Sequence, residues 1–105
     1  MIIIIGRAKV DSDRVEELRP ALQAMMRHTL EESGCLSYSL AIEDLGGNGR
    51  PAVLSIAERW EDECALKAHF ESDHMTAFNK AVDGAVWSLD VKMFDAANER
   101  PLALS

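Results

Sequence analysis

Histidine is the side chain that most readily exchanges protons near neutral pH, and this chain has three of them. His69 lies beside Phe70 on the apolar face of a helical pattern, which predicts a partly buried ring. His74 follows a Ser-Asp pair that can begin a new helix and present the ring near exposed backbone donors. His28 lies beside an earlier apolar stripe. These histidines are candidates for proton transfer, and each of them could instead be an ordinary packed or surface side chain.

Glu58 is a carboxylate on a strand face that is otherwise apolar, with Ile56 and Trp60 as its neighbours on that face. A buried carboxylate is costly unless it is paired or opens into a solvated cavity. Glu58 could therefore orient a histidine, or act as a base with a raised pKa. It could also be a strand-end carboxylate that reaches water or pairs with an arginine. Four aromatic residues could wall a pocket for an aromatic ligand or belong to the core: Tyr38, Trp60, Phe70 and Trp87.

The sequence contains no residue pattern that is typical of a metal-binding or nucleotide-binding site. Cys64, His69 and His74 follow one another at intervals of five residues, whereas ligands on one helix face are three or four residues apart. The glycine-rich stretch 46–49 has no helix behind it, so it does not predict a phosphate-binding turn. The sequence also lacks the GxSxG pattern of a serine nucleophile. We therefore expect neither a metal ion nor a cofactor.

The composition fits one globular domain. The chain has 105 residues, of which 48% are hydrophobic and 28% are charged. Its formal net charge of -7 disfavours nucleic acid and anionic membrane surfaces as partners. The apolar run at residues 2–5 is too short for an export signal or a membrane span, and two cysteines do not make a disulfide framework. We therefore predict a cytoplasmic protein with reduced thiols.

Four segments have the residue pattern of strands, namely 2–10, 35–44, 52–60 and 85–95. The first is rich in isoleucine, and the next two alternate apolar residues with small or polar ones. The stretch between the second and third strands contains three glycines and a proline, which predicts a loop. Residues 96–105 have no periodicity, so we predict a folded domain over residues 1–95 followed by a C-terminal tail.

Two helical segments alternate with these strands. The first has apolar residues at three- and four-residue steps; we expect a cap at residues 12–13, a kink or a late restart at Pro20, and an end at Gly34. The second should be interrupted and capped again at residues 72–73 and should end at Gly84. The order βαββαβ predicts a ferredoxin-like α+β fold, in which a four-stranded antiparallel sheet carries both helices on one face.

The other face of this sheet should have no helix of its own to cover it. Two strands align bulky residues on one side: Leu36, Tyr38, Leu40 and Ile42 in the second, and Trp87, Leu89, Val91 and Met93 in the last. The opposite side carries small residues such as Ser39, Ala41 and Ala57. A face that is neither fully polar nor covered usually meets a partner. We therefore predict a homodimer that packs sheet on sheet and leaves an enclosed apolar chamber in each copy.

Two stretches resemble motifs of the antibiotic biosynthesis monooxygenase (ABM) family. Residues 32–38 (ESGCLSY) resemble its E-x-G-x-x-x-Y entry to the second strand. Residues 58–60 (ERW), followed by 69–74 (HFESDH), resemble its E-x-W … H-x-x-S-x-H stretch, and Phe78 stands at the usual aromatic position after it. The resemblance covers residues 2–95.

This resemblance implies a dimeric α+β barrel and a cofactor-independent monooxygenase of the quinol monooxygenase type. In that chemistry a deprotonated dihydroxy-aromatic substrate reduces dioxygen itself, and the protein supplies a dry cavity, a base and orientation. The implied partners are a small aromatic or hydrophobic molecule, dioxygen and a second copy of the chain. His69 and His74 are then the base candidates, and Glu58 is an orienting carboxylate. The implied substrate-binding residues are Trp60, Tyr38, Phe70, Phe78 and His28.

Other branches of the family leave alternatives open. The haem-degrading branch uses an asparagine on its first strand, and this strand has none, so haem degradation is disfavoured. A sugar-phosphate isomerase would need cations for an anionic substrate, for which Arg7, Lys9 and Arg59 are the candidates. A non-enzymatic dimer that binds a small hydrophobic ligand is the alternative from another functional class.

Overall fold

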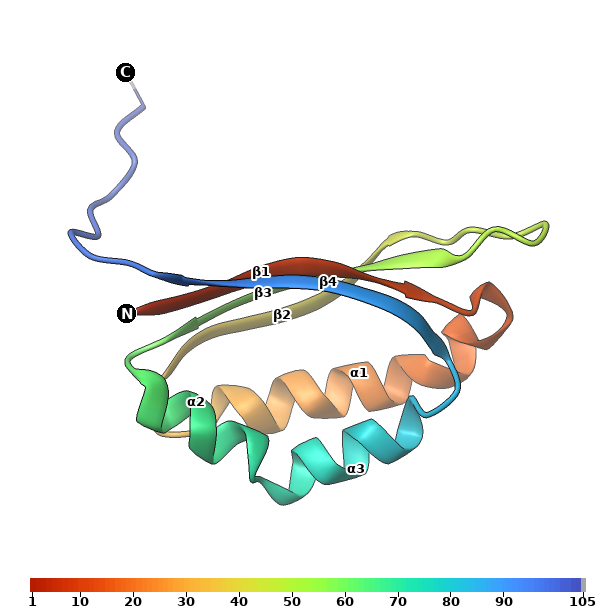
Figure 1. The fold of residues 1–105 in the computed structure, drawn as a ribbon, viewed down its shortest axis with the longest axis horizontal. Helices are drawn as coiled ribbons and strands as arrows, with labels where there is room; N and C mark the ends of the chain where they lie inside the picture. Colours follow the sequence, from red (N-terminus) through yellow and green to blue (C-terminus); the bar gives the residue numbers. More distant parts are fainter. Residues whose placement is uncertain (105) are drawn as a thin grey trace.

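One antiparallel sheet forms a layer of the molecule, and the helices form a second layer on one of its faces (Figure 1). The computed structural model describes residues 1–104, and Ser105, the last residue of the predicted tail, lies outside them. The strands are β1 (Ile2–Val10), β2 (Cys35–Asp44), β3 (Ala52–Trp60) and β4 (Val86–Asp95), in the spatial order β2-β3-β1-β4. The helices are a 3₁₀ turn η1 (Ser12–Arg14), α1 (Val15–Leu30), α2 (Glu63–Phe70) and α3 (Asp73–Ala81). This arrangement confirms the predicted ferredoxin-like fold, with its second helical segment divided in two.

Alternation along β1 decides which side chains enter the core. Ile4 and Ala8 are buried under the helices, while Ile5 and Lys9 face the opposite side and are exposed. Ile4 pairs with Glu58 of β3 and with Met93 of β4, which places these three side chains in one row across the sheet. The helix contributes a matching apolar stripe at three- and four-residue steps, which consists of Val15, Leu18, Leu22, Met25 and Thr29.

The start of α1 differs from the prediction. Asp11, rather than a residue at 12–13, caps the 3₁₀ turn η1 that leads into α1, since its carboxylate accepts a hydrogen bond from the backbone N–H of Asp13 at 3.0 Å. Arg14, at the N-cap of α1 itself, makes no side-chain cap hydrogen bond. Asp11 is held in place because its own N–H donates to the carbonyl of Ala85 at 2.8 Å. The helix then continues from Val15 through Pro20 without interruption, so the late restart that we considered does not occur. The buried stripe on both sides of the proline offsets the one hydrogen bond that a proline removes.

The break between α2 and α3 lies where the sequence predicted it. The Ser72 hydroxyl accepts a hydrogen bond from the Met75 N–H at 3.2 Å and donates to the carbonyl of His69 at 2.7 Å. One serine therefore ends α2 and begins α3 within a few residues. As a consequence, His69 lies at the end of one helix and His74 in the first turn of the next.

The edge strand β4 contains a bulge that changes one predicted alignment. Val86 pairs with Val10 and Ser88 pairs with Lys9, so Trp87 has no partner of its own in the ladder. The prediction that Trp87 lies in one row with Leu89, Val91 and Met93 is therefore wrong for Trp87, which is half exposed and lines no cavity wall. The prediction that Leu36 shares a row with Tyr38 is wrong for the same reason, since Cys35 pairs with Trp60 and Ser37 with Arg59, which leaves Leu36 unpaired and exposed. Such bulges depend on strand pairing and cannot be deduced from alternation in a single strand.

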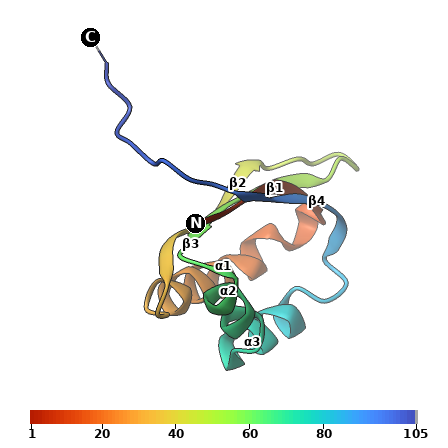
Figure 2. The same ribbon diagram turned by 60° about the vertical axis from the view of Figure 1, so that its left-hand side comes forward.

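The face of the sheet opposite the helices is open, as Figure 2 shows after rotation. Ile5 and Phe94 are half exposed on it, and Arg7 pairs there with Glu43 at 2.9 Å. After β4 the chain extends away from the sheet, and residues 96–104 form neither helix nor strand (Figure 1). Within residues 1–104, no helix is both long enough and apolar enough to cross a membrane.

Candidate active site

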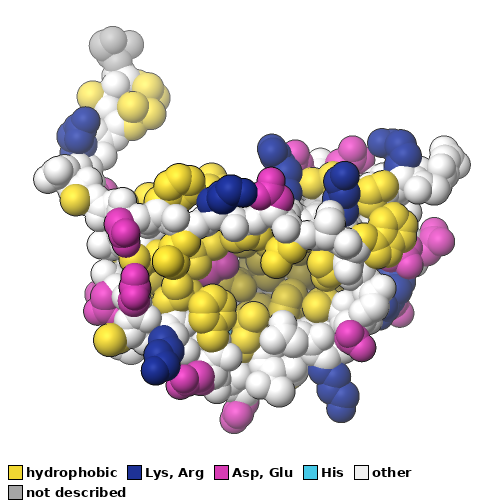
Figure 3. Space-filling model, in the orientation of Figure 1, with side chains coloured by type: hydrophobic (Ala, Val, Ile, Leu, Met, Phe, Trp, Pro, Cys, Tyr) yellow, Lys and Arg dark blue, Asp and Glu magenta, His cyan; other side chains and the backbone are white. Residues whose placement is uncertain are grey.

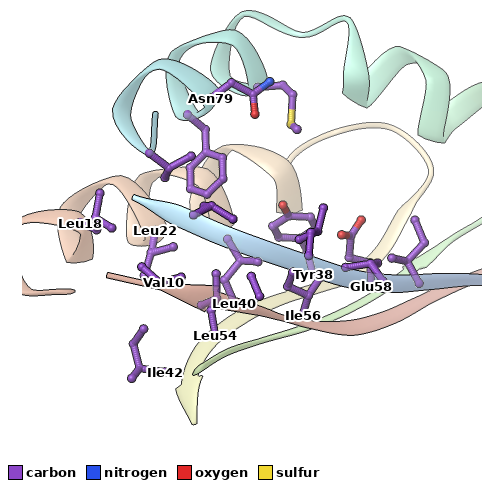
Figure 4. A pocket seen from close by; sticks show the side chains of 18 of the residues that line it. Val10, Leu18, Leu22, Tyr38, Leu40, Ile42, Leu54, Ile56, Glu58 and Asn79 are labelled. Carbon is purple, nitrogen blue, oxygen red and sulfur yellow. The ribbon is translucent and has the colours of Figure 1, made fainter. Parts of the chain in front are cut away.

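A cavity of about 600 Å³ lies between the helix-facing side of the sheet and helices α1, α2 and α3. Figure 3 shows it as a hollow lined by hydrophobic side chains, and Figure 4 shows the lining from close by. Its apolar walls include Val10, Leu18, Leu22, Leu40, Ile42, Leu54 and Ile56. A concave, mostly apolar space of this volume is typical of a binding site for a small molecule.

Two polar side chains enter this cavity from adjacent strands. Tyr38 of β2 and Glu58 of β3 are direct partners in the sheet, both are buried, and both line the cavity. Their oxygen atoms point from the sheet toward the helices (Figure 4). The indole N–H of Trp60 donates a hydrogen bond to Glu58 Oε1 at 2.9 Å. One end of the cavity therefore offers a carboxyl group and a phenol side by side in apolar surroundings.

The electrostatics of this pair follow from its burial. Burial raises the pKa of Glu58, and this effect is opposed by the Trp60 hydrogen bond and by the charge of His69, while the charge of Glu32 adds to it. Burial also raises the pKa of Tyr38, together with the charges of Glu58 and Glu32. The phenol therefore keeps its proton as a hydrogen-bond donor, and Glu58 can take up a proton at a higher pH than an exposed glutamate.

Glu32 brings the two predicted base histidines together. Its Oε1 lies 2.9 Å from Nδ1 of His69 and also contacts Nε2 of His74. Only 1% of His69 is exposed, and its ring centroid lies 4.8 Å from that of Trp60 and 5.4 Å from that of Tyr38. The histidines therefore form a hydrogen-bonded unit with one carboxylate, and this unit packs against residues at the polar end of the cavity.

The same three side chains are the ones that could hold a metal ion among the described residues. The ligand atoms of Glu32, His69 and His74 lie within 4.8 Å of one another, and two histidines with one carboxylate suit several first-row divalent metals. Coordination would require both ring nitrogens and the oxygen to turn toward one point at about 2.0–2.2 Å. Hydrogen bonds from both rings to Glu32 Oε1 account for the observed arrangement without an ion. Cys64 is exposed on α2 and is not part of this cluster.

The structure divides the predicted site residues into two groups. Tyr38, Glu58, Phe70 and Phe78 line the cavity. Trp60 does not line it, since Trp60 is fully buried and supports Glu58 from within the core. The three histidines do not line it either. His28 stacks on His74 with ring centroids 5.7 Å apart, in a separate groove between α1 and α3.

Sequence reasoning gave no role to Glu32, which is the residue that connects the two histidines. It lies 37 positions before His69, in the turn that follows α1. Gly34 adopts a positive φ of 85° in this turn and lets the chain reverse into β2. The family motif that begins at Glu32 was a signal that the position matters, but no spacing rule connects a turn residue to a helix so far along the chain.

Replacing Trp60 by Phe should raise the pKa of Glu58 further and destabilise the fold by about 1–3 kcal/mol. Phenylalanine keeps an aromatic ring in the core but removes the N–H that donates to Glu58 Oε1. Titration of Glu58 by carbon-detected NMR and unfolding in urea would measure both effects. Trp87→Phe is the control, because Trp87 is exposed and lies outside the cavity lining. Equal shifts in both variants would show that the indole N–H does not stabilise the Glu58 carboxylate.

Several known proteins are similar to this chain. Residues 1–81 match the family model described as Antibiotic biosynthesis monooxygenase. YcnE of Bacillus subtilis, provisionally named a monooxygenase, is 32% identical over 78 residues, which make up 74% of this chain and 78% of YcnE. YgiN of Escherichia coli, named a probable quinol monooxygenase, is 29% identical over 68 residues, or 61% of this chain and 65% of YgiN. The structure of Rv0793 from Mycobacterium tuberculosis matches with a TM-score of 0.74 at 28% identity, covering 95% of this chain and 98% of that one.

Proposed function

Because the chain belongs to the antibiotic biosynthesis monooxygenase family, we propose that it is a cofactor-independent monooxygenase that acts on an aromatic quinol. The observation that carries this proposal is the apolar cavity with Glu58 and Tyr38 at one end. The name of YgiN as a probable quinol monooxygenase supports the substrate class. A base beside a hydrophobic chamber is what the deprotonation of such a substrate requires.

We assign the proton acceptor to Glu58, because it lines the cavity whereas the histidines do not. The carboxylate takes a hydroxyl proton from the quinol, and the Tyr38 phenol donates a hydrogen bond to the resulting oxyanion. The electron-rich ring reduces dioxygen and forms a carbon–oxygen bond with it. Cleavage of the O–O bond leaves one oxygen atom on the ring and releases the other as water, which carries away two protons. The balance is quinol plus O₂ giving hydroxyquinone plus water.

In this proposal, the histidine unit (Glu32, His69 and His74) influences Glu58 and does not contact the substrate. The charge of His69 acts on Glu58 and favours its ionised form, and Glu32 holds His69 and His74 in fixed orientations. A carboxylate that accepts an imidazole N–H fixes the tautomer of the ring and its direction. The prediction that these histidines serve the reaction is kept, with positioning and charge as their role.

Oxygen uptake with a panel of hydroquinones, in protein freed of metal by a chelator and free of flavin, tests the proposed reaction. We expect saturable uptake of one O₂ per quinol and incorporation of one atom of ¹⁸O from ¹⁸O₂ into the product. Autoxidation gives hydrogen peroxide instead of water, so catalase should release oxygen only in the protein-free control. Uptake no faster than that control with every quinol would reject the monooxygenase and leave the non-enzymatic binding of a hydrophobic ligand.

The isomerase alternative finds less support in the geometry. The side chain of Arg7 points to the open face, where it pairs with Glu43, and Arg59 contacts Ser37 and Glu99. Neither arginine nor Lys9 lines the cavity. An anionic sugar phosphate in this cavity would therefore lack the three cations that were candidates for binding it, and Lys92, which does line the cavity, is exposed and pairs with Asp90.

We also propose that a second copy covers the open face of the sheet. Ile5 and Phe94 are half exposed there, and the small side chains of Ser39, Ala41 and Ala57 leave room for close approach. The mass of the particle in solution, measured by light scattering, tests this proposal.

We also propose a cytoplasmic location for the protein. Both cysteines are free thiols, which is compatible with a reducing compartment.

A further inference from the structure

The cavity is long, because its lining follows almost the whole sheet. On β1 the lining begins at Ile4 and continues to Val10, and on β4 it extends from Met93 back to Val86. Six residue steps in a strand span about 20 Å. A single aromatic ring or a fused pair of rings occupies only part of that length.

The polar side chains that are buried in this cavity lie at one end only. Tyr38 and Glu58 are in the row of Ile4, and Phe70 at the end of α2 also lines the cavity. Beyond that row, the buried lining of the floor and of α1 is apolar as far as Val10: Val15, Leu18, Leu22, Leu40 and Leu54. Three polar residues line the cavity from exposed positions, namely Asn79, Asp83 and Lys92. The buried interior therefore has a polar head end and an apolar remainder.

The apolar remainder is accessible along one side. Leu89 and Met93 line the cavity from β4 and yet are 66% and 55% exposed. Helix α3 packs against α1, and Figures 1 and 3, which share one orientation, show that the hollow opens between β4 and α3. A flexible chain could therefore enter sideways between β4 and α3, without passing through a narrow opening.

We propose that the substrate is an amphiphile, namely a phenol or quinol with a hydrocarbon chain. Its ring binds at Tyr38 and Glu58, and its chain lies along the apolar remainder of the cavity toward Val10, which we call the slot. This inference rests on the proposed function for its head group only. With the ring in place, the remaining length holds a chain of about eight to ten carbons. A short quinol would leave most of the apolar lining in contact with water.

Binding of 4-n-alkylphenols, from phenol to 4-dodecylphenol, tests the inference without any turnover. The affinity, measured by isothermal titration calorimetry below the aggregation limit of each compound, should rise up to about fourfold for each added methylene. The rise should end near eight to ten carbons, where the slot is full. n-Alkanols of equal chain length should bind at least tenfold more weakly, because they lack the ring that meets Tyr38 and Glu58.

Two variants place an obstacle midway along the slot. Leu89→Trp enlarges an exposed side chain on β4 that pairs with Ala8, and Ala8→Phe fills the floor at the same level. Either change should reduce the affinity ratio of nonylphenol to phenol at least tenfold. Lys67→Trp, at an exposed position on α2 outside the cavity lining, is the matched control and should leave the whole series unchanged. Since Leu89 is already exposed, its variant should fold even if the buried Ala8 variant does not.

The outcomes separate this inference from the proposed function. A flat chain-length series would overturn the inference even if short quinols are oxygenated, and would indicate that a second copy or the chain itself fills the slot. A steep series without oxygen uptake from any quinol would support the amphiphile and reject the monooxygenase. A steep series that Leu89→Trp and Lys67→Trp leave equally unchanged would overturn the inference, because the chain would then bind elsewhere.

Discussion

The variant Glu58→Gln should lose quinol turnover by a factor of about 10²–10⁴ while it stays folded. Glutamine has the same shape, and its carbonyl oxygen can still accept the Trp60 N–H, but it cannot take a proton from the substrate. In the unchanged protein, activity should rise with pH through the raised pKa of Glu58, because only the ionised carboxyl acts as a base. The profile of kcat/KM against pH measures this rise in activity, and the profile of the variant should lack it.

The stability of the fold should change with pH in the opposite sense. Burial raises the pKa of Glu58 above its ordinary value of 4.5, so the folded state holds this proton more tightly than the unfolded state. In the window between the two pKa values the unfolded state loses its proton first, and stability contributed by Glu58 decreases as the pH rises. Urea unfolding across this window should show the decrease in the unchanged protein and a smaller one in Glu58→Gln.

Glu16→Gln is the matched control for both measurements. Glu16 is an exposed glutamate that pairs with Arg19 on α1, outside the cavity lining and away from the open face of the sheet. We expect its turnover to stay within about twofold of the unchanged protein, since exposed ion pairs contribute little. If Glu58→Gln folds and turns over as fast as this control, Glu58 is not the proton acceptor and the proposed mechanism is wrong.

The strands could be predicted closely, because strand alternation is a local property. Each of β1, β2 and β3 has the predicted bounds. In β2 and β3, small or polar residues such as Ser39 and Ala57 face away from the helices, whereas β1 is marked by its run of isoleucines, of which Ile5 faces away. The break at Ser72 was predictable for the same reason, because a serine hydroxyl acts on backbone groups within three residues. These features need no knowledge of distant contacts.

Features that depend on pairing or on packing could not be predicted. The bulge at Trp87 results from the register between β4 and β1, and the cap at Asp11 depends on a hydrogen bond to Ala85. The cavity likewise depends on packing between elements that are distant in the sequence. Whether Glu58 faces a packed helix or an empty space depends on how α3 lies relative to β4, which single-strand patterns do not encode. For this reason the residue types of the site were predictable, and its division into a cavity and a histidine unit was not.

Removing both imidazoles with His69→Ala and His74→Ala should reduce turnover by about 10–10²-fold, less than the loss of Glu58, because the histidines orient and charge the site and do not accept the substrate proton. The double variant removes the His69 charge that favours the ionised form of Glu58, and it leaves Glu32 without its two donors. An unpaired carboxylate that is largely shielded from water costs about 1–3 kcal/mol, and 15% of the Glu32 side chain is exposed, so the variant should also unfold at lower urea. Glu32→Gln gives a milder test, because an amide keeps the volume and can still accept one N–H.

The three variants should not act additively, since Glu32, His69 and His74 form one hydrogen-bonded unit. Adding Glu32→Gln to the double histidine variant should lower turnover by less than about threefold more, whereas independent residues would multiply their effects. Lys67→Ala, an exposed position on α2, is the control and should change turnover by less than twofold. A folded double variant with unchanged turnover on a true substrate would remove both histidines from the mechanism. Glu58 and Tyr38 would then catalyse the reaction without help from the histidine unit.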